Sequence, residues 1–275
     1  MFFLSCPIVF PVKLPDDTLD RRRGITTRED SDMILADTRH HLTRDDAQLV
    51  ARLIARDSGT ELSVVERELA DHGIDSVLDD PRLPLALLQS RQGGCASLPL
   101  FAYVMVRHAL TRLGETDRLL ADYLAALMLH FGLRDRANRA GESDDQVYTT
   151  LADIAADLDD PDARRSFLVR THLGNYALWL SGFYPDYIEH RRWRRGGPDL
   201  EYYEEMGRRG FQLAADHRLA ANHGLATLYA TAAERFGLLR AALNDVSDAL
   251  LFPNRYSPER LMRQVTSEAR WRRLH

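Results

Sequence analysis

The segment between residues 170 and 190 contains the densest set of side chains that could bind a ligand or transfer a proton. If this segment is helical, His172, Tyr176 and Trp179 are spaced i, i+4 and i+7 and lie on one face. Asn175 lies beside them, and burying such a polar pair is costly unless each group has a partner. The pattern indicates a pocket for a polar small molecule.

Pro185 interrupts this segment, and a carboxylate and an imidazole follow it at helical spacing. Asp186 and His190 are four residues apart, so the carboxylate could orient the ring for acid–base chemistry. A concave pocket containing these groups would favour an enzyme or a ligand-binding protein. The candidate ligand-binding residues of the whole segment are Arg170, His172, Asn175, Tyr176, Trp179, Asp186 and His190.

Structural packing explains the same side chains and is the favoured interpretation. Aromatic residues at helical spacing usually belong to a core, and buried polar groups usually have hydrogen-bond partners within the protein. Gly174 and Gly182 would let a second backbone approach this helix closely. His108 and His130, on two other apolar segments, could line an interior pocket, but we interpret both as core histidines. Ligand binding stays open as the alternative.

A run of arginines with one tryptophan follows directly and is typical of nucleic-acid binding. Arginine contacts phosphate, and an aromatic ring stacks on a base. However, acidic residues occupy positions 199, 201, 204 and 205, and salt bridges to them would explain the run without any partner. Nucleic acid is therefore an unfavoured partner. The candidate nucleic-acid residues are Arg191, Arg192, Trp193, Arg194 and Arg195.

The composition excludes several classes of enzyme. Lys13 is the only lysine among the 36 basic residues, and it precedes the expected folded region. Walker-type phosphate loops, Schiff-base chemistry and a lysine general base are therefore excluded. Dinucleotide glycine fingerprints, HExxH helices, GxSxG elbows and EF-hand loops are also absent from the sequence. Cys6 and Cys95 are too isolated for a disulfide framework or a zinc site. We expect no metal and no cofactor.

Residues 66–78 have the approximate spacing of a helix-turn-helix, but the element that would read DNA is acidic. Asp75, Asp79 and Asp80 would be repelled by the phosphate backbone. We therefore exclude DNA recognition through this element.

The apolar periodicity from Met33 onward is helical almost everywhere, and no alternating strand pattern occurs. The sequence predicts an all-α protein, an irregular multi-helix bundle or orthogonal helical array of roughly ten to twelve helices. Helices are expected from a Thr43–Asp46 cap, from a Ser63–Glu66 capping box to Gly73, and over residues 81–92, 97–114, 117–136, 143–157, 160–182, 185–195, 198–216, 217–236, 237–251 and 258–273.

Residues 1–32 lack a helical pattern and are expected to be a disordered extension. Residues 33–275 are expected to form a single helical domain or two docked subdomains. Residues 33–160 contain 13 arginines and 22 acidic residues, whereas residues 161–275 contain 18 arginines and 13 acidic residues. Halves of opposite charge could dock on each other, within one chain or between subunits. A basic face that binds a partner is the alternative.

The lack of catalytic motifs and the opposed charges favour a non-catalytic helical interaction or regulatory protein of bacterial type. Its partner would be another protein or a second copy of the chain, and the net charge of −5 argues against a nucleic-acid binder. Apolar stretches too short to span a bilayer and two isolated cysteines favour a cytoplasmic location, with no membrane partner. One alternative is a helical enzyme or small-ligand binder that uses Arg170–His190. The other is RNA or DNA binding through Arg191–Arg195 and the C-terminal helix.

Overall fold

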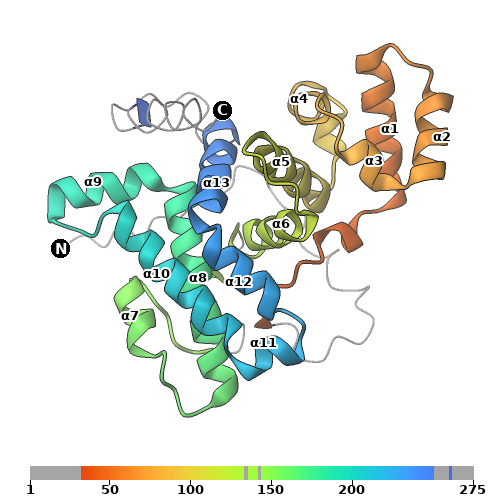
Figure 1. Ribbon diagram of the computed structural model, residues 1–275. Helices are drawn as coiled ribbons and strands as arrows, with labels where there is room; N and C mark the ends of the chain where they lie inside the picture. Colours follow the sequence, from red (N-terminus) through yellow and green to blue (C-terminus); the bar gives the residue numbers. More distant parts are fainter. Residues whose placement is uncertain (1–31, 133–135, 142–143, 251–259, 262–275) are drawn as a thin grey trace.

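The computed structural model describes residues 32–132, 136–141, 144–250 and 260–261 (Figure 1). Within these residues the protein has 13 α-helices and no strand, which confirms the predicted all-α array. The helices are α1 (Arg44–Ser58), α2 (Leu62–His72), α3 (Ile74–Leu78), α4 (Leu83–Gln89), α5 (Leu98–Arg112), α6 (Arg118–Gly132), α7 (Leu151–Ala156), α8 (Ala163–Phe183), α9 (Pro185–Arg195), α10 (Leu200–Ala215), α11 (Arg218–Asn222), α12 (Ala226–Glu234) and α13 (Phe236–Leu250).

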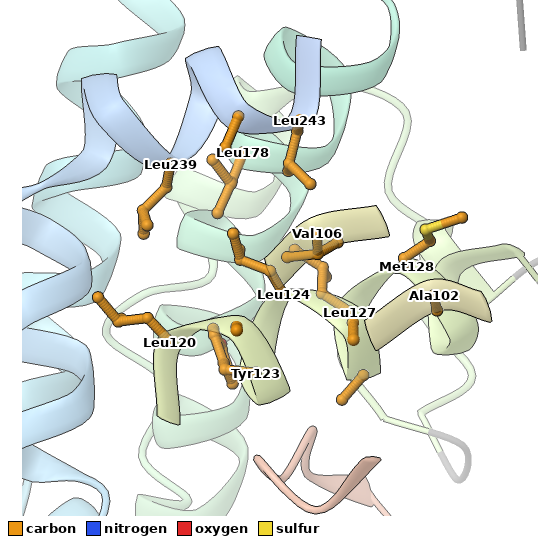
Figure 2. Close-up of a cluster of buried hydrophobic side chains, with 14 of the residues drawn as sticks. Ala102, Val106, Leu120, Tyr123, Leu124, Leu127, Met128, Leu178, Leu239 and Leu243 are labelled. Carbon is orange, nitrogen blue, oxygen red and sulfur yellow. The ribbon is translucent and has the colours of Figure 1, made fainter. Parts of the chain in front are cut away.

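Helix α8 is the central helix of the array. Of its 21 residues, 15 are buried, because α10 and α13 pack along it and α6 crosses it. Figure 2 shows the core where α5, α6, α8 and α13 meet, formed by the fully buried side chains of Val106, Leu124, Leu127, Leu178 and Leu243. Its buried residues, which include polar ones such as His172 and Asn175, face nearly all directions around the helix, as expected of a helix at the centre of an array.

Glycines allow α8 and α10 to pack unusually closely. A Cβ atom at Gly210 would lie 2.5 Å from the backbone nitrogen of Gly174, and one at Gly174 would lie 2.6 Å from the Phe211 ring. The α10 backbone therefore approaches α8 closely at Gly174, as predicted, but the glycine that makes room for a backbone is Gly210, and the space beside Gly174 is filled by the Phe211 ring. Gly182 likewise makes room for a side chain, because a Cβ atom there would lie 2.7 Å from the Cβ of Leu243 on α13.

The predicted capping box at Thr43 is present at the start of α1. The Thr43 hydroxyl accepts a hydrogen bond from the backbone N–H of Asp46, and the Asp46 carboxylate accepts one from the N–H of Thr43 at 2.9 Å. This carboxylate also accepts from the N–H and the hydroxyl of Ser97. One buried aspartate thus fastens the start of α1 to the start of α5.

The predicted capping box of Ser63 and Glu66 is wrong. Helix α2 already begins at Leu62, with Glu61 before it, so Ser63 lies inside the first turn and caps nothing. A residue within the first turn has helical backbone angles, and its side chain cannot take the position of a cap.

Two other predicted helix boundaries are also wrong. The helix expected over 143–157 begins only at Leu151, where Thr150 and Asp153 form the capping box, and Ser143 lies outside the described residues. The helix expected over 217–236 is divided into α11 and α12, because Gly224 has a φ of 69°, which an α-helix cannot continue through.

The expectation of a disordered extension concerns residues of which only Asp32 is described. Asp32 is buried and its carboxylate accepts a hydrogen bond from Arg164 at 2.6 Å, so the ordered part of the chain includes at least this residue. The helix expected over 258–273 falls outside the described residues except at Arg260 and Leu261.

Ion pairs join the acidic and basic parts of the chain. Arg165, near the start of α8, contacts Asp144, Asp157 and Asp160. Helix α5, from the acidic part, packs on α13 from the basic part. The choice between one domain and two docked subdomains stays a prediction.

Candidate functional site

Helix α8 brings the predicted aromatic face together. The His172 ring lies 5.7 Å from the Tyr176 ring and 5.8 Å from the Phe131 ring of α6, measured between centroids. Phe131 also lies 5.7 Å from Trp179, and Tyr148 lies 5.7 Å from His172. The three α8 side chains share one face, as their spacing predicts.

A small cavity of about 20 Å³ lies beside His172. This volume holds about one water molecule and is far below that of a pocket for a substrate or cofactor. Polar side chains from four parts of the chain form much of its wall: Asp32, His130, Arg136, Arg139, His172 and Asn175.

Among the described residues of this wall, His172 is the one with a buried side-chain atom that has no hydrogen-bond partner. Its ring is 2% exposed, and its Nε2 atom has no hydrogen-bond partner among the described residues. Burial lowers the pKa of His172 to about 3, and the charge of Arg136 acts in the same direction. The ring is therefore neutral at pH 7, and its pKa is too far from the working pH for an efficient general acid or base.

We expect the free energy of unfolding to depend on pH because His172 is neutral in the folded protein. An unfolded histidine has a pKa near 6.5 and binds a proton that the folded ring excludes, so the free energy of unfolding should fall as the pH is lowered below about 6.5. The contribution of His172 is at most about 1.4 kcal/mol per pH unit. Urea denaturation between about pH 6.5 and 4.5, above the titration of most carboxylates, measures the slope.

The matched variant for this measurement is His172→Leu, which keeps an apolar side chain of similar size but cannot titrate. The free energy of unfolding of this variant should fall less steeply with decreasing pH than that of the natural chain, by up to about 1.4 kcal/mol per pH unit, whatever its absolute stability. Equal slopes in the two proteins would contradict a buried, neutral His172.

Of the seven ligand-binding candidates, His172 and Asn175 line this cavity, and the other five do not. Arg170 is half-buried, and its guanidinium lies 3.9 Å from the carboxylate of Asp159. Asp186 and His190 belong to α9, and neither lines the cavity. The structure therefore gathers His172, Asn175, Tyr176 and Trp179 and separates them from Arg170, Asp186 and His190.

The two histidines interpreted as core residues differ from each other. The Nε2 atom of His108 lies 2.9 Å from the carbonyl oxygen of Leu78, which is the arrangement expected of a satisfied core histidine. His130 instead contributes to the wall of the cavity.

Helix α9 places the arginine–tryptophan run at one edge of the molecule, opposite the edge formed by α1–α3 (Figure 1). Only Pro185 and Ile188 of this helix are buried. Trp193 is 76% exposed, more than any other large apolar side chain of the described residues. The run thus has a large surface that contributes little to the core.

Among the described residues, acidic side chains pair with one arginine of the run, Arg192. The guanidinium of Arg192 lies 3.9 Å from the carboxylate of Glu189 and 3.9 Å from that of Asp199. Long ion pairs between exposed side chains contribute little to the stability of a protein. Arg194 and Arg195 are exposed and form no ion pair within the part of the chain that the structure describes. The salt bridges expected to explain the run are therefore mostly missing.

Glu204, one of the acidic residues expected to bind this run, pairs elsewhere. Its carboxylate lies 2.7 Å from Arg240 on α13 and 3.5 Å from Arg208 on its own helix. Glu204 on α10 therefore forms an ion pair with α13 and does not neutralise the arginines of α9.

In comparisons with protein-family models, with curated proteins and with solved structures, no match to this chain was found. No helix within the described ranges is long and apolar enough to cross a membrane.

A further charged cluster, not predicted from the sequence, joins α3, α5, α6 and the 3₁₀ turn Thr38–His41. Burial raises the pKa of Asp79, but hydrogen bonds from Arg107 and Arg118 outweigh this and lower it to about 2. Three arginines alternate with three aspartates, so the charges balance and the cluster is structural. Its members are Arg39, Arg107, Arg118, Asp75, Asp79 and Asp122.

The signal for this cluster is present in the sequence. Asp75 lies in α3 and Asp79 directly follows its last residue, and both carboxylates bind Arg118. These two carboxylates argue against DNA recognition by this segment. They also predict that arginines from other parts of the chain pack against it, as Arg107 and Arg118 do.

Proposed function

We propose that this protein is a non-catalytic helical interaction protein that binds an acidic segment of another protein through α9. The observation that carries the proposal is the exposed indole of Trp193 next to Arg194 and Arg195, which form no ion pair with any described residue. Tryptophan and arginine are the residues that most often dominate the binding energy of protein interfaces. A ring that is 76% exposed gives the isolated chain little folding energy.

Charge complementarity defines the chemistry of the partner. Arg194 and Arg195 can each form bidentate hydrogen bonds with a carboxylate, while Trp193 covers an apolar side chain between two such carboxylates. A nucleic acid suits this surface less well, because Glu189 and Asp199 lie beside the arginines and would face its continuous line of phosphates.

The geometry around His172 supports a non-catalytic function. The cavity has room for about one water molecule, and the pKa of His172 is about 3. Neither property suits a substrate site. We place the protein in the cytoplasm, where an arginine-rich helix would meet acidic segments of other cytoplasmic proteins.

Fluorescence anisotropy tests the proposal directly. The probe is a labelled peptide of glutamate, aspartate and leucine, and the competitor is a single-stranded oligouridylate of the same length. We expect saturable binding of the peptide that weakens as the salt concentration rises, with little competition from the oligouridylate. A peptide that does not bind, or an oligouridylate that binds more tightly, would overturn the proposal.

A further inference from the structure

Helix α2, at the edge of the molecule opposite α9, contributes little to the core (Figure 1). Of its 11 residues, only Val65 is buried. Val64, Glu68 and Asp71 are spaced i, i+4 and i+7 and share one face of the helix, and Glu61 precedes Val64 by three residues. All four residues are exposed, Val64 by 45%. These four residues, here called the α2 face, place an apolar side chain between carboxylates.

The carboxylates of the α2 face form no ion pair with any residue that the structure describes. The Ser63 hydroxyl donates to Glu61 at 3.4 Å, which is long for such a hydrogen bond. By contrast, Asp75 on the neighbouring α3 pairs with two arginines. Residues 61–72 contain four acidic residues and one arginine. The α2 face is therefore acidic, and its carboxylates can pair with the cations of a partner.

The α2 face has the chemistry that α9 is proposed to bind. The arginines at the end of α9 can pair with its carboxylates, and Trp193 can cover Val64 between them. Each helix has 11 residues and is about 16 Å long, so the two surfaces match in length. Because α9 and α2 lie at opposite edges of one molecule, the α9 of a chain does not cover its own α2 face (Figure 1). A contact between the two surfaces therefore joins two copies.

We propose that a second copy of this chain is a partner of α9, which binds the α2 face of that copy. The inference rests on the function proposed for α9. Different surfaces of the two copies meet in this contact, so it is heterologous, and successive copies form open chains or a closed ring. Exposed ion pairs between two short helices give a weak contact, with a Kd on the order of 100 µM. The chain should therefore be monomeric at the micromolar concentrations of the peptide experiments.

Sedimentation velocity of the natural chain tests the association without any substitution. We expect the weight-average sedimentation coefficient to rise between about 10 and about 500 µM protein in about 0.05 M salt. In about 0.5 M salt it should stay near the value of the monomer, because salt screens exposed charges. A coefficient that does not rise at low salt, or that rises equally at both salt concentrations, would overturn the inference.

Two variants and their mixture assign the contact to the two surfaces. Arg194→Gln with Arg195→Gln neutralises α9, and Glu68→Gln with Asp71→Asn neutralises the α2 face. Each variant alone should associate at least about 10-fold more weakly than the natural chain. An equimolar mixture should form dimers and nothing longer, because each dimer uses the one intact α9 and the one intact α2 face. A mixture that stays monomeric would contradict the assignment.

Asp216→Asn with Glu234→Gln is the matched control for the loss of two acidic charges. Both residues are exposed, and they lie at the end of α10 and at the end of α12. This variant should associate as the natural chain does. An equal loss of association in this control would mean that net charge, and not the α2 face, drives the contact.

The anisotropy titration with the acidic peptide separates this inference from the proposed function. The variant with a neutralised α2 face keeps α9 intact and should bind the peptide as tightly as the natural chain. If the natural chain binds the peptide but does not self-associate, the inference is wrong and the proposed function stands. If it neither binds the peptide nor self-associates, both are wrong.

Discussion

Replacing Gly210 by alanine is expected to lower the free energy of unfolding by about 3 kcal/mol or more. The new methyl group would lie 2.5 Å from the backbone nitrogen of Gly174 and 3.0 Å from the carbonyl oxygen of Arg170. Backbone atoms cannot rotate away as a side chain can, so α10 would have to move off α8. Chemical denaturation of the variant measures the loss.

Gly237→Ala is the matched control, because it is the same substitution in another helix. The nearest atom to a Cβ at Gly237 is 3.6 Å away, which is an ordinary contact. Since alanine favours a helix over glycine, this variant should be more stable by about 0.5–1 kcal/mol. Similar effects of the two substitutions would contradict the close crossing of α8 and α10.

Reversing two charges at the end of α9 should have the largest effect on binding. The double variant Arg194→Glu, Arg195→Glu is expected to weaken binding of the acidic peptide by at least about 100-fold, which corresponds to about 3 kcal/mol. Both side chains are exposed and form no ion pair with a described residue, so folding should be unaffected. Anisotropy titrations at about 0.1 M salt, where the Debye length is about 10 Å, measure the affinity.

The double variant Arg56→Glu, Arg67→Glu controls for the change in net charge. Both arginines are exposed and lie on α1 and α2, at the opposite edge of the molecule (Figure 1). This variant should bind the peptide within about 3-fold of the natural chain, because exposed charges more than a Debye length away are screened. If both double variants lose the same affinity, binding depends on net charge and not on α9.

The all-α fold and the aromatic face of α8 were predictable because both depend on local periodicity. His172, Tyr176 and Trp179 lie within two helical turns, so their spacing alone decides that they share a face. The starts of α1 and α9 were predictable for the same reason. Thr43 and Pro185 act on the residues immediately after them.

The cavity beside His172 was not predictable, because its wall comes from distant parts of the chain. Asp32 and His130 lie 140 and 42 residues before His172, and no local pattern relates them. The Arg39–Asp122 ion pair is likewise formed only when the array is assembled. The sequence shows which charges exist, but the packing of the helices decides which of them meet.

The pairing of the α9 arginines illustrates the same limit. The acidic residues that follow the run were expected to neutralise it, because they are near in sequence. Gly196, with a φ of 64°, ends α9 and redirects the chain into α10. Asp199 then reaches only Arg192, and Arg194 and Arg195 are left facing solvent.

Hydrogen–deuterium exchange with and without the acidic peptide is the most direct test of the proposed binding surface. If α9 is the surface, the peptide should slow exchange in residues 185–195 and at the start of α10, and leave α1–α3 unchanged. Protection located on α1–α3, or no protection under saturating peptide, would contradict the proposal that this protein acts through α9.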